Sequence, residues 1–249
     1  MDASAYAFAH GMRQTRATLR AWQSTPFAVV GRWLAGSLLA AVCLLTAVLA
    51  IAWLDRGYQQ VLTLRSPFAV GDPAEVLRIV ASNLLVLALH AMACVAGFMA
   101  GSSLPLQAQH QRGLSRWVHE HGARLAIVFV IGATIFSLSL QAYVIGHTLA
   151  GVSHFLGVSP ALLLLGVLPH AVLELTALFL PLAAWIIASR KGEWDQLLAA
   201  TFVTVAIAVP MVVLAGLIEV YVSPHLFTAL THIHPPIVRY SEGWLVTVG

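Results

Sequence analysis

Polar side chains inside long apolar stretches are the residues of this sequence whose types could carry chemistry. A charged side chain placed at the centre of a membrane helix costs about 2.5–3.5 kcal/mol on insertion scales. We therefore expect each such residue to have a partner or a function. The apolar stretches contain seven candidates: Asn83, His90, Gln141, His147, His170, Glu174 and Glu219.

His170 and Glu174 are four residues apart and therefore share one face of a helix. Pro169 removes one backbone hydrogen bond, so we predict a kink or break there. If a half-helix begins at Pro169, its positive dipole end favours an ionised Glu174 or an anionic ligand. Glu219 lies deep in a later apolar stretch. The predicted polar centre of the bundle comprises five residues: His170, Glu174, Glu219, Asn83 and His147.

The polar centre has three interpretations. Its members could only hold helices together, by pairing with one another and with backbone groups freed at prolines. They could instead form an ion or proton site, or a catalytic one. Histidine and carboxylate suit zinc, so His170, Glu174 and Glu219 are candidate metal ligands, with His147 as a further one. The sequence has no HExxH, GxSxG or glycine-rich phosphate loop. It therefore favours a role other than catalysis and identifies no cofactor.

Membrane-spanning helices are the elements that must position these residues. The chain is 59% hydrophobic and 9% charged, with a mean hydropathy of +0.86. A soluble domain is about 25% charged, so lipid must solvate much of this surface. Roughly 20 apolar residues cross the hydrocarbon core of a bilayer as a helix. The predicted spans are 33–54, 79–101, 124–146, 160–189 and 197–222.

The segments that flank the spans complete the predicted organisation. Residues 5–22 carry an apolar stripe beside arginines, which predicts an amphipathic helix in the membrane interface or on the protein's own cytoplasmic face. The expected domains are an N-terminal cytoplasmic segment (1–32), a transmembrane helical domain (33–224) and a C-terminal tail (225–249). The expected fold is all-α, a polytopic transmembrane bundle of about five spans with a broken fourth helix and an N-terminal interfacial helix.

The distribution of basic residues predicts the orientation. Alternate flanking segments, beginning with the N-terminal one, hold nine of the thirteen Lys and Arg residues. Because cytoplasmic loops carry the excess of Lys and Arg, the N-terminus should be cytoplasmic and the C-terminus outside. A formal net charge of +3 without a clustered basic face argues against nucleic-acid binding. We therefore expect a multi-pass protein of the cytoplasmic membrane.

Two motifs resemble those of a known family. Pro169 and His170, followed by Glu174 and then Leu and Ala in an apolar helix, are similar to the signature helix of the stage II sporulation protein M family. That family's pattern is Pro-His-Gly followed by Glu-Leu and Ala. Glu219, with Pro224 five residues later, resembles the family's second motif.

The resemblance covers about residues 80–226. Asn83 and Gly146 resemble two further positions of the family. Two departures are Ala171, where the family has glycine after the histidine, and residues 180–185, which replace a glycine-rich stretch.

The resemblance implies a membrane partner protein. In spore formers the named member belongs to a membrane complex with peptidoglycan hydrolases that drives engulfment, and relatives also occur where no spores form. We therefore expect a scaffold or accessory subunit whose partners are the lipid bilayer and other membrane proteins, including envelope-remodelling enzymes. Self-association stays open. The alternatives are a transporter or permease subunit with an intramembrane His/Glu ion or proton site and an intramembrane metal-dependent hydrolase.

Overall fold

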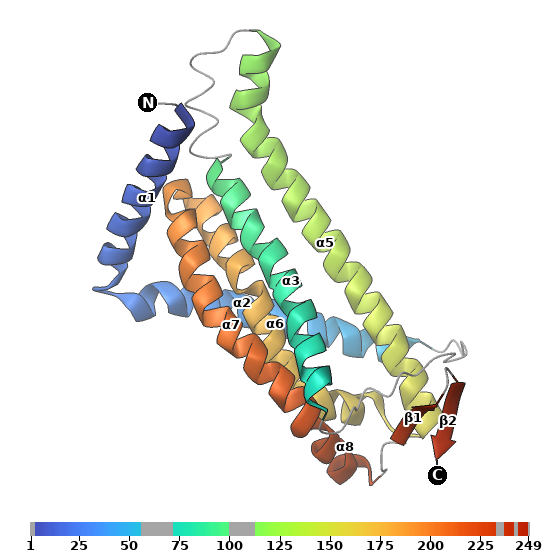
Figure 1. Ribbon diagram of the computed structural model, residues 1–249. Coiled ribbons are helices and arrows are strands. Elements are labelled where there is room, and N and C mark those ends of the chain that lie inside the picture. The colour runs from blue at the N-terminus through green and yellow to red at the C-terminus, as the bar shows by residue number, and fades with distance from the viewer. Residues whose placement is uncertain (1–2, 56–71, 100–112, 233–236, 242–243, 249) are drawn as a thin grey trace. The chain divides into compact units, whose positions relative to one another are not determined.

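The computed structural model describes residues 3–55, 72–99, 113–232, 237–241 and 244–248 (Figure 1). Its elements, in chain order, are α1 (Ala3–Trp22), α2 (Pro26–Leu54), α3 (Pro73–Phe98), α5 (Leu114–Leu156), α6 (Pro160–Lys191), the 3-10 turn η2 (Trp194–Gln196), α7 (Leu197–Tyr221), α8 (Ser223–Thr231), β1 (Ile237–Ser241) and β2 (Trp244–Val248).

Five of the described helices are long and apolar enough to cross a membrane: Pro26–Leu54, Pro73–Phe98, Val128–Leu156, Pro160–Lys191 and Trp194–Tyr221. They confirm the predicted polytopic helical bundle, and the chain is a multi-pass membrane protein. All five of these helices begin before or end beyond the apolar stretch that predicted them. The reason is that helical hydrogen bonding continues through the polar residues at a span's end.

The third span shows this extension best. The helix α5 has 43 residues, which at 1.5 Å per residue is about 65 Å. The hydrocarbon core is about 30 Å thick, so α5 is far longer than one crossing needs. Sequence reasoning placed its start at Arg124, ten residues after Leu114, where the helix begins.

Pro169 lies inside α6 and does not break it. The helix runs without interruption from Pro160 to Lys191, so the predicted broken fourth helix is wrong. Neighbouring helices and local backbone adjustments satisfy the groups that a proline frees, which is why membrane helices tolerate proline. No half-helix begins at Pro169, so the predicted dipole end beside His170 is absent. A kink that leaves the helix continuous stays a prediction.

The two ends of the chain carry more structure than the sequence indicated. The predicted amphipathic helix is present as α1, and Gly11 on it faces the side chains of Phe98 and Leu198, so α1 packs on the protein itself. The helix α2 already begins at Pro26, inside the predicted N-terminal segment. The predicted tail contains most of α8 and the antiparallel strands β1 and β2, which add a small hairpin to the helical fold.

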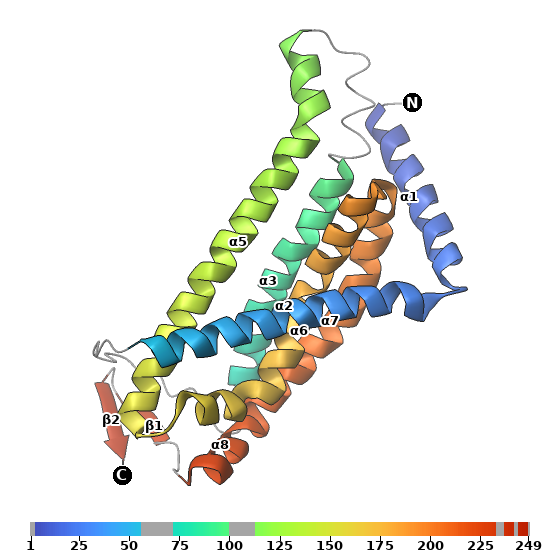
Figure 2. The same ribbon diagram turned by 180° about the vertical axis from the view of Figure 1, so that it is seen from behind.

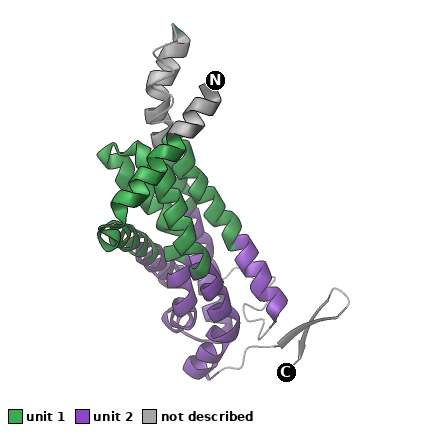
Figure 3. Cartoon of the chain, turned by 60° about the vertical axis from the view of Figure 1, so that its left-hand side comes forward, with its two compact units in different colours: residues 1–41, 83–137, 175–210 green, residues 42–82, 138–174, 211–249 purple. Residues whose placement is uncertain are grey.

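Residue contacts divide the chain into two compact units (Figure 3). Every span is divided between the two units. Unit 1 contains the N-terminal parts of the first, third and fifth spans and the C-terminal parts of the second and fourth, and unit 2 contains the remaining parts. A chain that crosses a membrane back and forth gives this alternation. Unit 1 comprises residues 1–41, 83–137 and 175–210, and unit 2 comprises residues 42–82, 138–174 and 211–249.

The core of unit 1 is apolar and rich in tryptophan. In both Figure 1 and Figure 2 the C-terminal part of α6 and the N-terminal part of α7 run side by side, joined through η2. Trp185, 2% exposed, packs with Cys94, Leu182 and Leu197 on one side of this pair. A second cluster surrounds Trp33 and consists of Leu180, Ala184 and Ala200, with Trp22, Val29 and Ile187 among its partly buried neighbours.

Two side chains of α3 bind the backbone of α6 within unit 1. The Nδ1 of His90 donates a hydrogen bond to the carbonyl oxygen of Leu178 at 2.7 Å. The thiol of Cys94 donates to the carbonyl oxygen of Pro181 at 3.1 Å. His90, a candidate for chemistry on sequence grounds, therefore joins two helices.

The units differ in charge. Among the described residues, unit 1 holds eight Lys or Arg positions and three acidic ones, whereas unit 2 holds two Arg and five acidic residues. The basic positions of unit 1 are Arg13, Arg16, Arg20, Arg32, Arg116, Arg124, Arg190 and Lys191. The acidic residues of unit 2 are Asp55, Asp72, Glu75, Glu174 and Glu219.

Candidate functional site

Four of the five residues predicted for the polar centre lie in unit 2. They are His147 on α5, His170 and Glu174 on α6, and Glu219 on α7, and each is half-buried. Asn83, also half-buried, is the first residue of the α3 segment of unit 1. Unit 2 is therefore where the candidate site is built.

A close approach of two helices places His147. A Cβ atom on Gly146 would lie 2.8 Å from the Cβ of Ile51 and 2.9 Å from the carbonyl oxygen of Val48. Only glycine allows α5 to come this near to α2. The next residue, His147, forms a hydrogen-bonded pair through Nδ1 with the carboxylate of Asp55, directly after α2. Gly146 thus allows the close contact between α5 and α2, and His147 adds a hydrogen bond between α5 and the residue after α2.

His170 connects α6 to α8. Its Nδ1 shares a hydrogen bond of 2.7 Å with the hydroxyl oxygen of Ser223, which is fully buried at the start of α8. One turn earlier on α6, Gly166 contacts Phe227 of α8, where an added Cβ would lie 3.6 Å from the Phe227 backbone. The short helix after the last span is therefore packed and bonded onto α6.

Glu219 lies beside the first turns of α3. Gly216, three residues earlier on α7, faces Val80, and an added Cβ there would come within 2.9 Å of the Val80 Cγ2. Glu75 and Arg78 of α3 form an ion pair, with 2.8 Å between Nε and Oε2. The carboxyl of Glu219 interacts electrostatically with both of them.

A third helix contributes to this group. Glu219 also interacts electrostatically with Glu174 of α6. We call Glu75, Arg78, Glu174 and Glu219 the acidic centre. It contains three carboxylates and one guanidinium, contributed by α3, α6 and α7. An excess of carboxylates among membrane helices is typical of a proton or cation site, and it disfavours an anion.

The described residues do not form a metal-binding site. No group of three His, Cys, Asp or Glu side chains is placed to hold a metal ion in the parts of the chain that the structure describes. The two histidines predicted for the polar centre have separate partners, since His147 pairs with Asp55 and His170 with Ser223. The three-ligand set predicted from His170, Glu174 and Glu219 is thus not assembled among these residues.

Sequence reasoning missed four of the partners. They lie near the end of a helix, where a polar residue looks like an ordinary flank: Asp55, Glu75, Arg78 and Ser223. The order of the spans along the chain could have indicated these partners. In a chain that crosses back and forth, the end of the first span, the start of the second and the ends of the third and fifth lie on one side. Asp55 and Arg78 are therefore natural partners for His147 and Glu219.

Comparison with known proteins gives one match. No curated protein and no solved structure matches the chain. Residues 122–224 match the family model described as Stage II sporulation protein M. The matched segment includes His147 and His170, together with Glu174 and Glu219, and it begins after Asn83. Over residues 122–224, therefore, the chain resembles the stage II sporulation protein M family, as its Pro-His and Glu motifs predicted.

Proposed function

We propose that this chain is an integral membrane scaffold or accessory subunit of a protein complex in the cytoplasmic membrane. One observation carries the proposal: polar side chains of unit 2 pair with one another across helices. Asp55 bonds His147, and His170 bonds Ser223. Such pairs hold membrane helices in a fixed arrangement. A bundle whose polar side chains bond to one another keeps its helices in place, and its outer surface is therefore stable enough to bind partners.

The partners that we propose are other membrane proteins, among them enzymes that remodel the cell envelope. The family match over residues 122–224 supports this class of partner. The helix α5 offers a surface, since Phe129, Phe136 and Tyr143 on it are 74, 71 and 59% exposed. A partner helix can replace lipid on such a surface, because membrane helices associate by packing and not by leaving water.

The proposed orientation has the N-terminus in the cytoplasm and the C-terminus outside. Unit 1 holds eight of the ten described basic positions, and basic residues favour the cytoplasmic side. A reporter fused after residue 192 should be active in the cytoplasm, and a reporter at residue 245 on the other side. A cytoplasmic reporter at residue 245 would contradict the orientation and the count of five spans.

Affinity purification in mild detergent tests the scaffold role. The wild-type chain, tagged and expressed in its own host, should co-purify with peptidoglycan hydrolase activity, measured on zymograms. Glu174→Gln should lower that yield or the stability of the bundle, whereas Asp195→Asn, an exposed acid in unit 1, should leave both unchanged. Purification of the wild-type chain without any hydrolase activity would contradict the proposed partner class.

The acidic centre favours a second candidate, a transporter or permease subunit with an ion or proton site. Glu219 and Glu174 come from two different spans and interact with each other, as ion-pathway carboxylates do. Purified protein in liposomes would then conduct a proton or cation flux that Glu219→Gln abolishes while the fold survives. Equal flux in wild-type and variant liposomes would exclude this candidate.

A further inference from the structure

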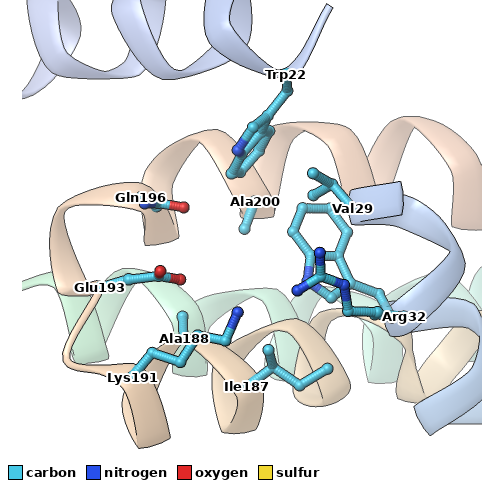
Figure 4. Close-up of a pocket in the computed structure, with 10 residues that line it drawn as sticks. Trp22, Val29, Arg32, Ile187, Ala188, Lys191, Glu193, Gln196 and Ala200 are labelled. Atoms are coloured by element: carbon cyan, nitrogen blue, oxygen red, sulfur yellow. The ribbon is translucent and has the colours of Figure 1, made fainter. Parts of the chain in front are cut away.

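A pocket of about 220 Å³ lies in unit 1 where four helical segments end or begin (Figure 4). Trp22 from the end of α1 and Trp33 from the start of α2 form one side. The last turns of α6 and the turn into α7 form the other, through Ala188 and Gln196. The volume is below the roughly 300–1,000 Å³ typical of sites for drug-sized ligands, so a small group fits best.

The walls of the pocket are fixed by packing. The rings of Trp22 and Trp33 meet edge to face, with centroids 5.2 Å apart and planes at 76°. Trp33 is 6% exposed. On the other side Gly192, with φ of +71°, ends α6, and the Glu193 amide donates to the carbonyl oxygen of Ala188 at 3.0 Å. This left-handed glycine turns the chain tightly into η2, so the backbone itself shapes this side of the pocket.

Two cations project into the pocket, and no described carboxylate forms an ion pair with either of them. The Nε of Arg32 donates to the Ala28 carbonyl oxygen at 3.0 Å, which leaves the two terminal amino groups of the guanidinium for a ligand. Figure 4 shows the Lys191 amino group and the Arg32 guanidinium pointing into the same space. Glu193 is the one acidic residue of the lining. Neither cation forms an ion pair within the described part of the chain, so the lining attracts an anion.

The pocket lies at one end of the spans α2, α6 and α7, where a bilayer places its headgroups. Apart from Trp22 of α1, its residues belong to the first turns of α2, the last turns of α6, and the segment from Glu193 to the first turn of α7. Tryptophan and basic residues are enriched where a span meets the headgroup region. Val29 and Ile187 give the pocket apolar walls. A ligand with a charged head and a hydrocarbon body satisfies both kinds of wall.

We propose that this pocket binds the phosphate headgroup of an anionic phospholipid, with Arg32 and Lys191 on the phosphate oxygens and the tryptophans against the glycerol and upper acyl chain. Basic pockets between membrane helices recognise anionic headgroups through this chemistry. The guanidinium and the ammonium complement the phosphate charge from two helices, so binding would also tie the start of α2 to the end of α6.

Lipid-dependent thermal stability of the purified full-length chain tests the proposal. Phosphatidylglycerol should raise the Tm in detergent, and phosphatidylcholine with the same acyl chains should raise it much less. Each cation near an anionic lipid contributes a factor of roughly five in affinity, so Arg32→Gln/Lys191→Gln should bind about 30-fold more weakly. Arg190→Gln is the matched control, because Arg190 is the neighbouring exposed cation in the last turn of α6 and does not line the pocket.

Other outcomes of the same titration overturn the proposal. If glycerol phosphate without acyl chains gives the same Tm shift, the ligand is a soluble phosphate. If Arg190→Gln weakens binding as much as the double variant does, the effect is general surface charge. If the double variant fails to fold, the single variant Lys191→Gln can be tested instead. It should fold, because the Lys191 side chain is exposed. Unchanged retention of phosphatidylglycerol by Lys191→Gln in native mass spectrometry would then contradict the assignment.

Discussion

The two units of the chain use different means to hold their helices together. Unit 1 packs apolar side chains around Trp33 and Trp185, and its described charges are mostly basic. Unit 2 brings helices close at Gly146 and Gly216 and places polar pairs and an acidic centre beside those contacts. Packed apolar clusters stabilise a fold without offering chemistry. We therefore expect the chemistry of polar groups inside the spans in unit 2, and stability should depend more strongly on unit 1.

Trp185→Ala gives the largest expected loss of stability. Trp185 is 2% exposed and contacts Cys94, Leu182 and Leu197. Truncating a buried tryptophan leaves a cavity and costs about 3–5 kcal/mol. Unfolding in detergent with increasing SDS measures the loss. Trp53→Ala is the control, since Trp53 is 59% exposed on α2 and should change the free energy of unfolding little. Equal losses at the two tryptophans would remove the packing argument for unit 1.

Gly146→Ala ranks second and tests whether close backbone approach holds unit 2. The new Cβ would lie 2.9 Å from a backbone oxygen, which cannot rotate away. Overpacking of this kind costs about 1–3 kcal/mol. Gly132→Ala on the same helix meets nothing within 4 Å. It should be neutral or stabilise α5, because alanine favours a helix by up to about 1 kcal/mol over glycine. If both variants behave alike, α5 does not depend on its contact with α2.

The sequence predicted the helices well and their partnerships poorly. Five spans could be placed because hydropathy depends on composition and length alone. The break at Pro169 was wrong because a proline's local cost does not decide whether neighbouring helices satisfy the freed groups. His170 and Glu174 were identified because a polar residue in an apolar run is conspicuous. Asp55 and Ser223 were missed because polar residues at helix ends are ordinary, and only the packing shows that they have partners.

The sequence also does not show which glycines lie where two helices meet. Gly132 and Gly146 lie on one helix and look alike in sequence, yet only Gly146 faces a neighbouring backbone. Which glycine marks a close approach depends on the partner helix, and a single sequence does not contain that pairing. The basic residues were more informative, because the positive-inside rule acts on position along the chain. The basic segments predicted to share one side fall in one unit, whereas which side is cytoplasmic stays a prediction.

The hydrogen bond between His170 and Ser223 should contribute less than either packing feature. Hydrogen bonds between membrane helices average about 0.6 kcal/mol and reach about 1.7 in double-mutant cycles. A cycle of His170→Ala, Ser223→Ala and the double variant should therefore give a coupling free energy in that range. The same cycle with Thr201→Ala in place of Ser223→Ala is the control, because Thr201 bonds the carbonyl oxygen of Leu197 on its own helix. A coupling near zero for the first pair would leave α8 held by Phe227 alone.

Glu219→Gln should change stability least, and it separates function from stability most sharply. The substitution keeps the size of the side chain and removes one carboxyl from the acidic centre. Relief of repulsion from Glu174 and Glu75 offsets the lost attraction to Arg78, so we expect a change within about 0.5 kcal/mol. Arg78→Gln should instead destabilise, by up to about 1 kcal/mol since Arg78 is half-exposed. Adding Glu219→Gln should restore part of that loss.

We expect Glu219→Gln to impair function because a carboxyl inside a span has a free-energy cost. A carboxyl that contributes little to stability, among like charges and inside a span, needs another reason to be there. Partner capture or ion flux should therefore fall in Glu219→Gln while the unfolding curve stays in place. If Glu219→Gln instead destabilises the chain as much as Trp185→Ala does, the acidic centre is a structural clamp, and the contrast between the two units disappears.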